Sequence, residues 1–565
     1  MIVIQTDITT LGAFLLLFLV TVIAYQFVLL NDGVYLDGWY LDGWQRRKEW
    51  DVFKRFFSEV GMPYWYYYGR LMALLPFRTL AYKILSFLSL YISALAVYFL
   101  CQKSGFLTNS ESMIIAVLML CYPGQQIAAE STVSQYFICP CLFFVACLLG
   151  LHAESSAGLA QWLFRGSALM LFFISFNMNS LLAFYYGFIL YIALLQIKEV
   201  GFQGFQLSQY VLYHMDYFLL PVLFWFLKEM ITPRHGYYKD YNRVSININR
   251  LISGIYGLFA VGLIENIGQA IIYVIKKPLF VFMILSCSSL FLTVSWVIGP
   301  ITGISEIKAF AIMLFGLVLL IFAGIPYILA GIRFGLRGWN TRNNVLLALP
   351  TALILYGSIN LVIKPFYVYT ILGCILAVFT IYLNYNYLGW IALWAKYRSM
   401  LQNLKNLPHA REFSIIGVRD QYPTPACNGS SPEHWTISIT YMFAWIWGDV
   451  THLGFSEDEW RKFFNKAVYA DSAQQVGHVI NKYTPEEIQK IIDNTTLDYA
   501  LKGIDINGKQ AVLVINKGNH NLGDIKLAIQ YLKKRFFMPE EMSAFLSGIT
   551  RLDFIPIESE NLNGV

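Results

Sequence analysis

Long apolar runs fill most of this chain up to residue 395, and they limit what it can fold into. A helix needs about 20 apolar residues to cross the hydrocarbon core of a bilayer, where no water can satisfy an exposed backbone. The runs therefore predict an all-α polytopic membrane domain with about twelve spans. The predicted spans are 10–30, 80–101, 111–123, 136–151, 163–179, 180–197, 211–230, 251–275, 278–299, 308–331, 344–363 and 366–395.

The composition agrees with this class. Of the 565 residues, 57% are hydrophobic and 13% are charged, whereas soluble domains carry about 25% charged residues. The first run, Leu11 to Leu30, follows no basic residue and lacks a small-residue cleavage site, so it is predicted to remain as a span. No basic patch interleaved with aromatic residues points to nucleic acid as a partner.

One predicted span leaves an alternative open. The run 251–275 contains Glu265, Asn266 and Gln269. Polar residues this close together in the middle of an apolar run are costly inside a bilayer. The segment could therefore be a surface helix instead of a span.

Basic residues in the short loops predict the orientation, because lysine and arginine are enriched in cytoplasmic loops. A cytoplasmic N-terminus places most of the basic short loops inside, including the segment with Arg333, Arg337 and Arg342. That rule alone explains these arginines. An even number of spans then puts both termini in the cytoplasm, opposite the long loops 31–79 and 231–250.

The composition changes near Lys396, which predicts domains at 1–398 and 399–565. Ser456 with Glu459, and Thr484 with Glu487, fit capping boxes at the start of helices. Asn507-Gly508, between Lys502–Ile506 and Ala511–Ile515, predicts a tight β-hairpin. The tail is therefore expected to be a small α+β soluble domain.

Three acids separated by glycines and aromatic residues open the first long loop. They are Asp32, Asp37 and Asp42. A carboxylate just outside the membrane can accept a proton from an attacking hydroxyl, or hold a divalent metal ion. The alternative is an interfacial loop with aromatic anchors and solvated acids.

The stretch from Asp42-Gly43-Trp44 through Glu59-Val60-Gly61-Met62-Pro63 to Gly69-Arg70 resembles the first loop of bacterial GT-C glycosyltransferases related to the protein O-mannosyltransferases. The resemblance implies a GT-C-like membrane fold and a catalytic base among the loop acids. Many members carry these acids adjacent or one residue apart, whereas five positions separate them here. Asp37 and Asp42 are favoured over Asp32.

Two further segments fit that resemblance. Tyr122-Pro123 followed by Glu130 resembles the short second loop, which brings another polar group toward the site; an exposed loop acid is the alternative. The segment after residue 231 carries cationic side chains that suit a phosphate group, since arginine offers a planar donor fork and lysine a point charge. These candidates are Arg234, His235, Lys239 and Arg243. An interfacial loop that touches anionic lipid is the alternative.

The resemblance implies an inverting glycosyltransferase of a bacterial inner membrane. It would move a sugar from a polyprenyl phosphate to a hydroxyl on a glycan, lipid or protein at the outer face. Asp37 or Asp42 would act as base. The histidines of the tail are not spaced as a metal site, and a need for Mg²⁺ or Mn²⁺ stays open. Two alternatives also stay open: a transporter or flippase for a lipid-linked glycan, and a non-catalytic assembly subunit.

Overall fold

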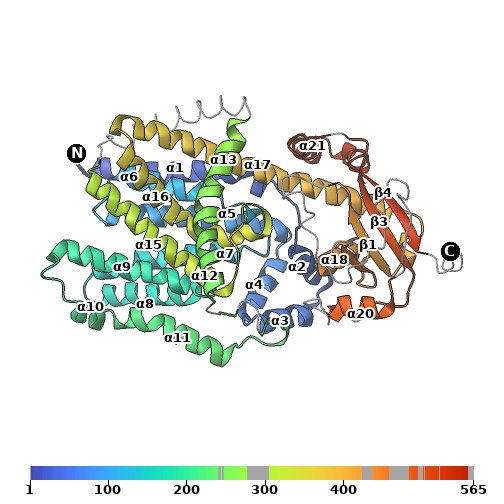
Figure 1. Ribbon diagram of the computed structural model, residues 1–565, viewed down its shortest axis with the longest axis horizontal. Coiled ribbons are helices and arrows are strands. Elements are labelled where there is room, and N and C mark those ends of the chain that lie inside the picture. The colour runs from blue at the N-terminus through green and yellow to red at the C-terminus, as the bar shows by residue number, and fades with distance from the viewer. Residues whose placement is uncertain are drawn as a thin grey trace.

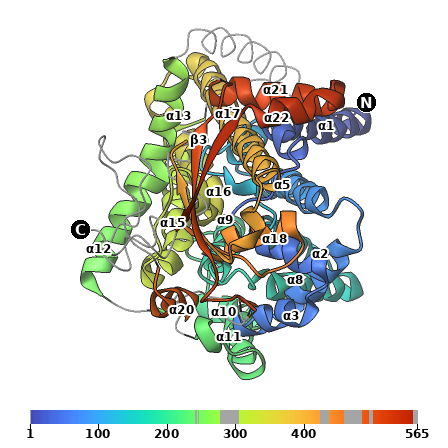
Figure 2. The same ribbon diagram turned by 90° about the vertical axis from the view of Figure 1, so that its right-hand side faces the viewer.

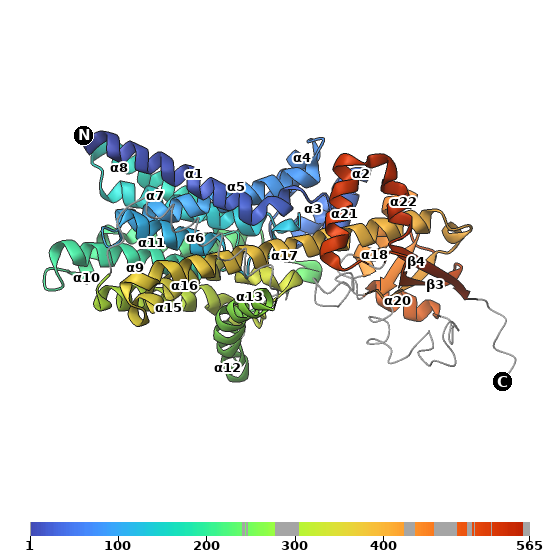
Figure 3. The same ribbon diagram turned by 90° about the horizontal axis from the view of Figure 1, so that it is seen from above.

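The computed structural model describes residues 2–239, 243–244, 247–276, 304–422, 436–456, 483–493, 500–501, 503–520 and 522–557. Figure 1 shows a bundle of helices that run along the long axis of the molecule, with a small sheet at one end. The N-terminus lies at the opposite end of the bundle, as the view from above in Figure 3 also shows.

The described part of the bundle contains nine helices that are long and apolar enough to cross a membrane, or ten if the bent pair α10–α11 counts as one span. This confirms a multi-pass membrane protein. The described helices of the bundle, which include the shorter α6 and the pair α12 and α13 that makes up one candidate span, are α1 (Ile2–Leu29), α5 (Arg78–Lys103), α6 (Asn109–Leu120), α7 (Gln135–Glu154), α8 (Gly158–Ser175), α9 (Leu181–Val200), α10 (Leu207–Tyr213), α11 (Met215–Ile231), α12 (Ile248–Gly257), α13 (Asn266–Ile275), α15 (Glu306–Ala330), α16 (Ala348–Val362) and α17 (Pro365–Lys405).

Three of the predicted spans need comment. The run 111–123 forms α6, which has only 12 residues and is buried within the bundle. The predicted span 278–299 lies outside the described residues. The run 251–275 forms α12 and α13, joined through a π-helical turn at Leu258–Glu265. Figures 1 and 2 show this helix crossing the direction of the bundle, although its length and composition place it among the nine candidate spans of the described residues.

The first long loop folds into three short helices between the bundle and the sheet. They are α2 (Gly38–Arg47), α3 (Trp50–Glu59) and α4 (Tyr64–Ala73). Trp44 is fully buried. Its ring packs against Tyr40, Phe53 and Phe56. This aromatic core holds α2 and α3 together although each has only ten residues.

The predicted domain boundary at residues 398 and 399 falls inside α17, a single helix of 41 residues that continues from the bundle into the tail. Ser399 of this helix contacts Thr550 at 2.8 Å between the two hydroxyl oxygens, and Asn403 donates to the Thr550 carbonyl. Helix α17 therefore forms part of the core of the tail as well as part of the bundle.

The tail contains a four-stranded sheet in the order β2-β1-β3-β4. Strand β1 pairs in parallel with β2 and β3, and β3 pairs antiparallel with β4. The elements are β1 (Ile415–Asp420), α18 (Thr436–Trp447), β2 (Leu453–Ser456), α20 (Pro485–Asp493), β3 (Gln510–Lys517), α21 (Asp524–Phe537), α22 (Met542–Ser547) and β4 (Thr550–Ile557).

The local predictions for the tail had mixed outcomes. The Thr484 and Glu487 capping box is confirmed, with both reciprocal bonds present. The hairpin at Asn507-Gly508 is wrong: a turn forms there, but β3 pairs with β1 and β4, so its partners are distant in sequence. Glu459 of the other capping box lies outside the described residues.

The prediction that the tail lies opposite the first long loop is also wrong. Ser438 of α18 donates a hydrogen bond to the Leu36 carbonyl, and the Trp44 indole donates to Tyr441 of α18. The tail therefore packs on the loop that directly follows α1. Since α1 runs the length of the bundle, the N-terminus and the tail lie at opposite ends (Figure 3). The side of the membrane on which each terminus lies stays a prediction.

Candidate functional site

Asp37 lines a cavity of about 200 Å³ between the first loop and the segment before α7. The residue directly precedes α2. Aromatic side chains and hydroxyl groups surround it: Tyr40, Phe53, Phe56, Trp65, Tyr68, Tyr82, Ser131, Thr132, Ser134, Tyr136, Tyr238 and Trp339. Burial raises the pKa of the Asp37 carboxyl, while the Arg342 charge and a hydrogen bond from Tyr40 oppose the rise. A raised pKa makes a carboxylate a stronger base at neutral pH.

Glu130 lies beside the backbone of Asp37 and Gly38. A Cβ atom on Gly38 would come within 2.8 Å of the Glu130 carboxylate, so glycine is needed for this approach. One Glu130 oxygen accepts hydrogen bonds from the backbone and hydroxyl of Thr132, at 3.1 and 2.9 Å. The other oxygen is buried and has no hydrogen-bond partner among the described residues. Burial raises the pKa of Glu130 to about 8, and the charge of Asp37 adds to the rise.

The loop that carries Glu130 is held by distant elements. Tyr25 donates to the Gln125 side chain, and Trp390 donates to the Gln126 carbonyl. Gln126 in turn donates to the Leu336 carbonyl. The predicted second loop is thus held by α1, α17 and the segment before η4 (Gly338–Leu347), and these contacts fix the segment that carries Glu130.

A second cavity, of about 660 Å³, adjoins the first and is rich in cationic side chains. Four residues line both cavities: Trp65, Gln135, Tyr136 and Arg342. The cations that line the larger cavity are Lys228, Arg234, Lys239, Arg243 and Arg342, and Glu229 is also present. Three of the four residues predicted to bind phosphate therefore meet at one cavity that adjoins the one lined by Asp37.

Arg342, like Lys228, is a charged cavity residue that the sequence did not predict as part of the site. It was assigned to a cytoplasmic loop, yet it lines both cavities and its charge lowers the pKa of Asp37. Its guanidinium stacks on Trp339, with 3.9 Å from Cζ to the ring centroid. Nη1 is buried and has no hydrogen-bond partner among the described residues. The sequence did contain one sign that Arg342 belongs to a site, because it follows Trp339 by three residues. Arginine stacks on aromatic faces at recognition sites.

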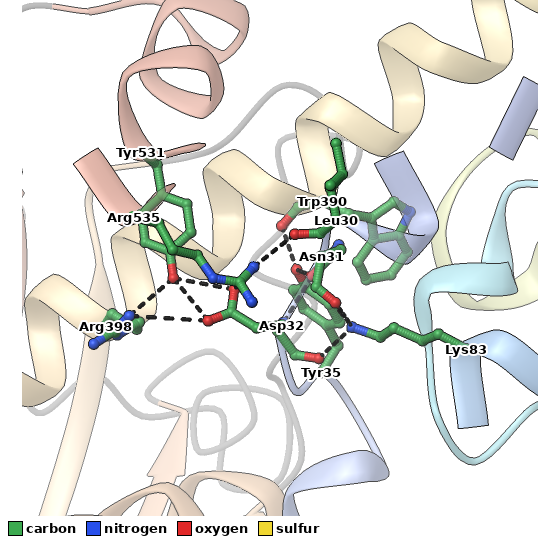
Figure 4. Close-up of polar contacts among 10 residues, drawn as sticks. Leu30, Asn31, Asp32, Tyr35, Lys83, Trp390, Arg398, Tyr531 and Arg535 are labelled. Carbon is green, nitrogen blue, oxygen red and sulfur yellow. Dashed lines mark hydrogen bonds and ion pairs between the residues drawn. The ribbon is translucent and has the colours of Figure 1, made fainter. Parts of the chain in front are cut away.

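The other predicted residues take different places. Asp42 is buried and pairs with Arg46 and Arg78, at 2.5 and 2.9 Å. Asp32 pairs with Arg535 of the tail at 3.1 Å (Figure 4). His235 is exposed, and its backbone donates to the Glu59 carbonyl. None of these three is among the described residues that line the two cavities.

A metal site is not apparent in the described part of the chain. No group of three or more His, Cys, Asp or Glu side chains gathers closely enough there to hold an ion. Asp37 and Glu130 alone offer two carboxyl groups, and Glu130 is largely protonated at neutral pH because its pKa is about 8. The cationic side chains at the larger cavity carry the positive charge that an anionic ligand needs.

The two adjoining cavities carry groups of opposite charge. One end has a half-buried carboxylate with a raised pKa, and the other has several cationic donors. Such a pair suits a reaction in which a hydroxyl loses a proton while an anionic group leaves. Comparisons of the chain with protein-family models, curated proteins and solved structures gave no match.

Proposed function

We propose that this chain is a membrane glycosyltransferase that moves a sugar from a polyprenyl phosphate to a hydroxyl acceptor at the outer face of the membrane. The observation that carries the proposal is Arg342, which borders both the cavity lined by Asp37 and the cavity lined by the other cations. A sugar linked to a phosphate would extend from one cavity into the other. The resemblance of the first loop to GT-C enzymes supports the same assignment.

In the proposed reaction the acceptor hydroxyl attacks the anomeric carbon. A carbon–oxygen bond forms there while the bond between that carbon and the phosphate oxygen breaks. The hydroxyl proton passes to the Asp37 carboxylate. Polyprenyl phosphate leaves as the anion, and Arg342 with Arg234 and Arg243 stabilises its charge through charge-assisted hydrogen bonds. A phosphate leaving group is acidic, so no strong general acid is required.

Glu130 acts as a hydrogen-bond donor in this proposal, whereas Asp37 acts as the base. With a pKa of about 8 it is mainly neutral at pH 7, so its unpaired oxygen can donate a hydrogen bond. That donor lies next to the Asp37 backbone and supports the neighbouring carboxylate or a sugar hydroxyl. Asp37 is then the charged base, and Glu130 is a neutral partner.

The test uses the purified full-length protein in lipid nanodiscs with polyprenyl-phosphate donors that carry radiolabelled hexoses or pentoses. Transfer to added membrane glycan or lipid acceptors is measured. The Asp37→Asn variant is expected to lose roughly 10²- to 10⁴-fold in rate, the usual contribution of a general base. The matched control is Asp51→Asn, which removes an exposed acid of α3 that lies in the same loop. Full transfer by Asp37→Asn would refute the assignment of the base.

A binding measurement separates donor recognition from catalysis. Asp37→Asn is expected to keep donor affinity, whereas Arg342→Gln is expected to weaken it. A donor that binds equally well to both variants and to the wild type would argue against the cationic cavity as the phosphate site.

A further inference from the structure

The tail holds the first loop on both sides of Asp37. Before Asp37, the Asp32 carboxylate accepts hydrogen bonds from the Tyr531 hydroxyl at 3.1 Å and pairs with Arg535 at 3.1 Å. Arg535 also donates to the Leu30 carbonyl at 2.7 Å, and Figure 4 shows these groups gathered around Asp32. After Asp37, the Trp44 indole donates to the Tyr441 hydroxyl at 2.7 Å.

The contact closest to Asp37 involves the residue before it. Ser438 of α18 donates its hydroxyl to the Leu36 carbonyl at 3.0 Å. Leu36 has φ of 45°, in the left-handed region that leucine rarely adopts. A residue in this region persists only when the surrounding structure holds it there. Leu36 is therefore held in a strained backbone conformation. The tail bonds to the carbonyl oxygen of the peptide that links Leu36 to Asp37.

This conformation decides how α2 begins. The Gly38 amide donates to the Tyr35 carbonyl at 2.7 Å, and the Trp39 amide donates to the Leu36 carbonyl at 3.3 Å. Tyr35 is itself fixed, because its hydroxyl donates to the Trp390 carbonyl at 2.6 Å. The left-handed residue turns the chain between this anchor and the helix. If Leu36 relaxed to a negative φ, the direction of the Asp37 side chain would change.

The membrane domain fixes the start of the same segment. The buried ammonium of Lys83 donates to the carbonyls of Asn31 and Gly33, each at 2.8 Å. These contacts come from α5, and the same ammonium lies 5.7 Å from the centre of the Tyr35 ring. From the tail, α18 reaches Leu36 directly through the Ser438 hydroxyl.

From these contacts we infer that the tail is a positioning element for Asp37, and that Ser438 is a positioning residue within it. The Ser438 hydroxyl holds the Leu36 carbonyl and so keeps the left-handed turn that aims Asp37 into its cavity. This inference rests on the proposed function for its effect on rate, but its structural part can be tested without any activity.

The structural test measures hydrogen exchange of the Gly38 and Trp39 amides in the full-length protein. Ser438→Ala removes the hydroxyl, so exchange at both amides is expected to speed up at least tenfold. The matched control is Thr440→Ala, on the same helix, because the Thr440 hydroxyl bonds to Gly454 within the tail. That variant is expected to leave both amides unchanged. Unchanged exchange in Ser438→Ala would overturn the inference.

The kinetic test separates positioning from binding. Ser438→Ala is expected to lower kcat roughly ten- to hundredfold, the scale of a small misplacement of a reacting group, while the donor KM stays unchanged. Ser438→Thr keeps the hydroxyl and is expected to restore most of the rate. Faster exchange with an unchanged kcat would overturn the positioning role. If Asp37→Asn retains full transfer while Ser438→Ala still accelerates exchange, the proposed function fails and the structural coupling stands.

Discussion

The Asp32 carboxylate lies 3.1 Å from the Arg535 guanidinium, which joins the segment after the first span to helix α21 of the tail. Both side chains are about 29% exposed. A partly exposed pair of this kind contributes roughly 0.2–1 kcal/mol, and salt screens it. Here Tyr531 and Arg398 also face the carboxylate, at 3.1 and 3.9 Å. The contact is thus a small network that fixes how the tail sits on the loop.

A double-mutant cycle on this network tests its strength. Asp32→Ala and Arg535→Ala are expected to show a coupling energy of about 1 kcal/mol in thermal unfolding at low salt. The coupling should decrease when the ionic strength rises to 1 M, because that shortens the screening length to about 3 Å. A coupling that is zero at low salt would mean that the tail docks without this pair. The pair Arg411 and Asp449, which lies within the tail, provides an exposed control.

Replacing Glu130 by Gln should change how stability depends on pH. The pKa of Glu130 is about 8 in the folded protein and about 4.5 in the unfolded chain. The folded state therefore binds the extra proton between these values, and stability falls as pH rises through that window. Glu130→Gln removes this dependence. The variant is expected to match the wild type near pH 4 and to be more stable at pH 9. The gain in the free energy of unfolding is about 1.4 kcal/mol for each unit by which folding raises the pKa.

Thermal unfolding in nanodiscs at the two pH values measures this difference. Glu412→Gln is a suitable control, since its carboxyl is exposed and its pKa is lowered by Lys509 and His409. A parallel loss of stability in wild type and Glu130→Gln between pH 4 and pH 9 would contradict the raised pKa of Glu130.

The Asp37→Asn and Asp42→Asn variants should differ in how much free energy of unfolding they lose. Asp42 is buried between Arg46 and Arg78, so Asp42→Asn leaves two guanidinium groups without their anion. We expect a loss of roughly 1–3 kcal/mol in the free energy of unfolding. Asp37→Asn should cost nothing in stability, because burial already disfavours the charged carboxyl. Chemical unfolding of both variants measures the contrast, and equal losses would mean that the two acids have similar surroundings.

A multi-pass membrane protein could be predicted from the sequence, because the length of its apolar runs is enough to indicate membrane-spanning helices. The runs that became α5, α7, α9 and α15 matched their helices within a few residues. The third run forms only the 12-residue helix α6, which begins with four polar residues and is almost entirely buried by protein. Hydropathy does not distinguish burial in protein from exposure to lipid. The same limit applies to the crossing helix α12–α13.

The site could be predicted only in part. Asp37, Arg234, Lys239 and Arg243 were identified from residue type and position after a span, and the structure brings them to two adjoining cavities. Glu130 was identified in the same way, and its carboxylate lies beside Gly38. Asp42 looked equivalent to Asp37, because the repeated Tyr-Leu-Asp-Gly-Trp pattern gives both the same neighbours. Its pairing with Arg78 depends on how α5 packs against α2, which no local pattern reveals. The charge rule assigned Arg342 to a cytoplasmic loop and gave no sign that it lines the same cavity as Asp37.

Arg342 provides the sharpest test of how the two cavities act together. Its charge lowers the pKa of Asp37 against the effect of burial. Arg342→Gln should therefore raise the pKa of Asp37 further. If Asp37 is the base, transfer falls as pH drops through its pKa, so the acid limb of the profile of kcat/KM should move to higher pH in the variant.

Donor affinity should also weaken, roughly ten- to hundredfold, because a charge-assisted bond to phosphate is lost. Arg333→Gln, an exposed residue of the same segment, is the control and should change neither quantity. A weaker donor affinity with an unmoved acid limb would separate Arg342 from Asp37 and place the base elsewhere.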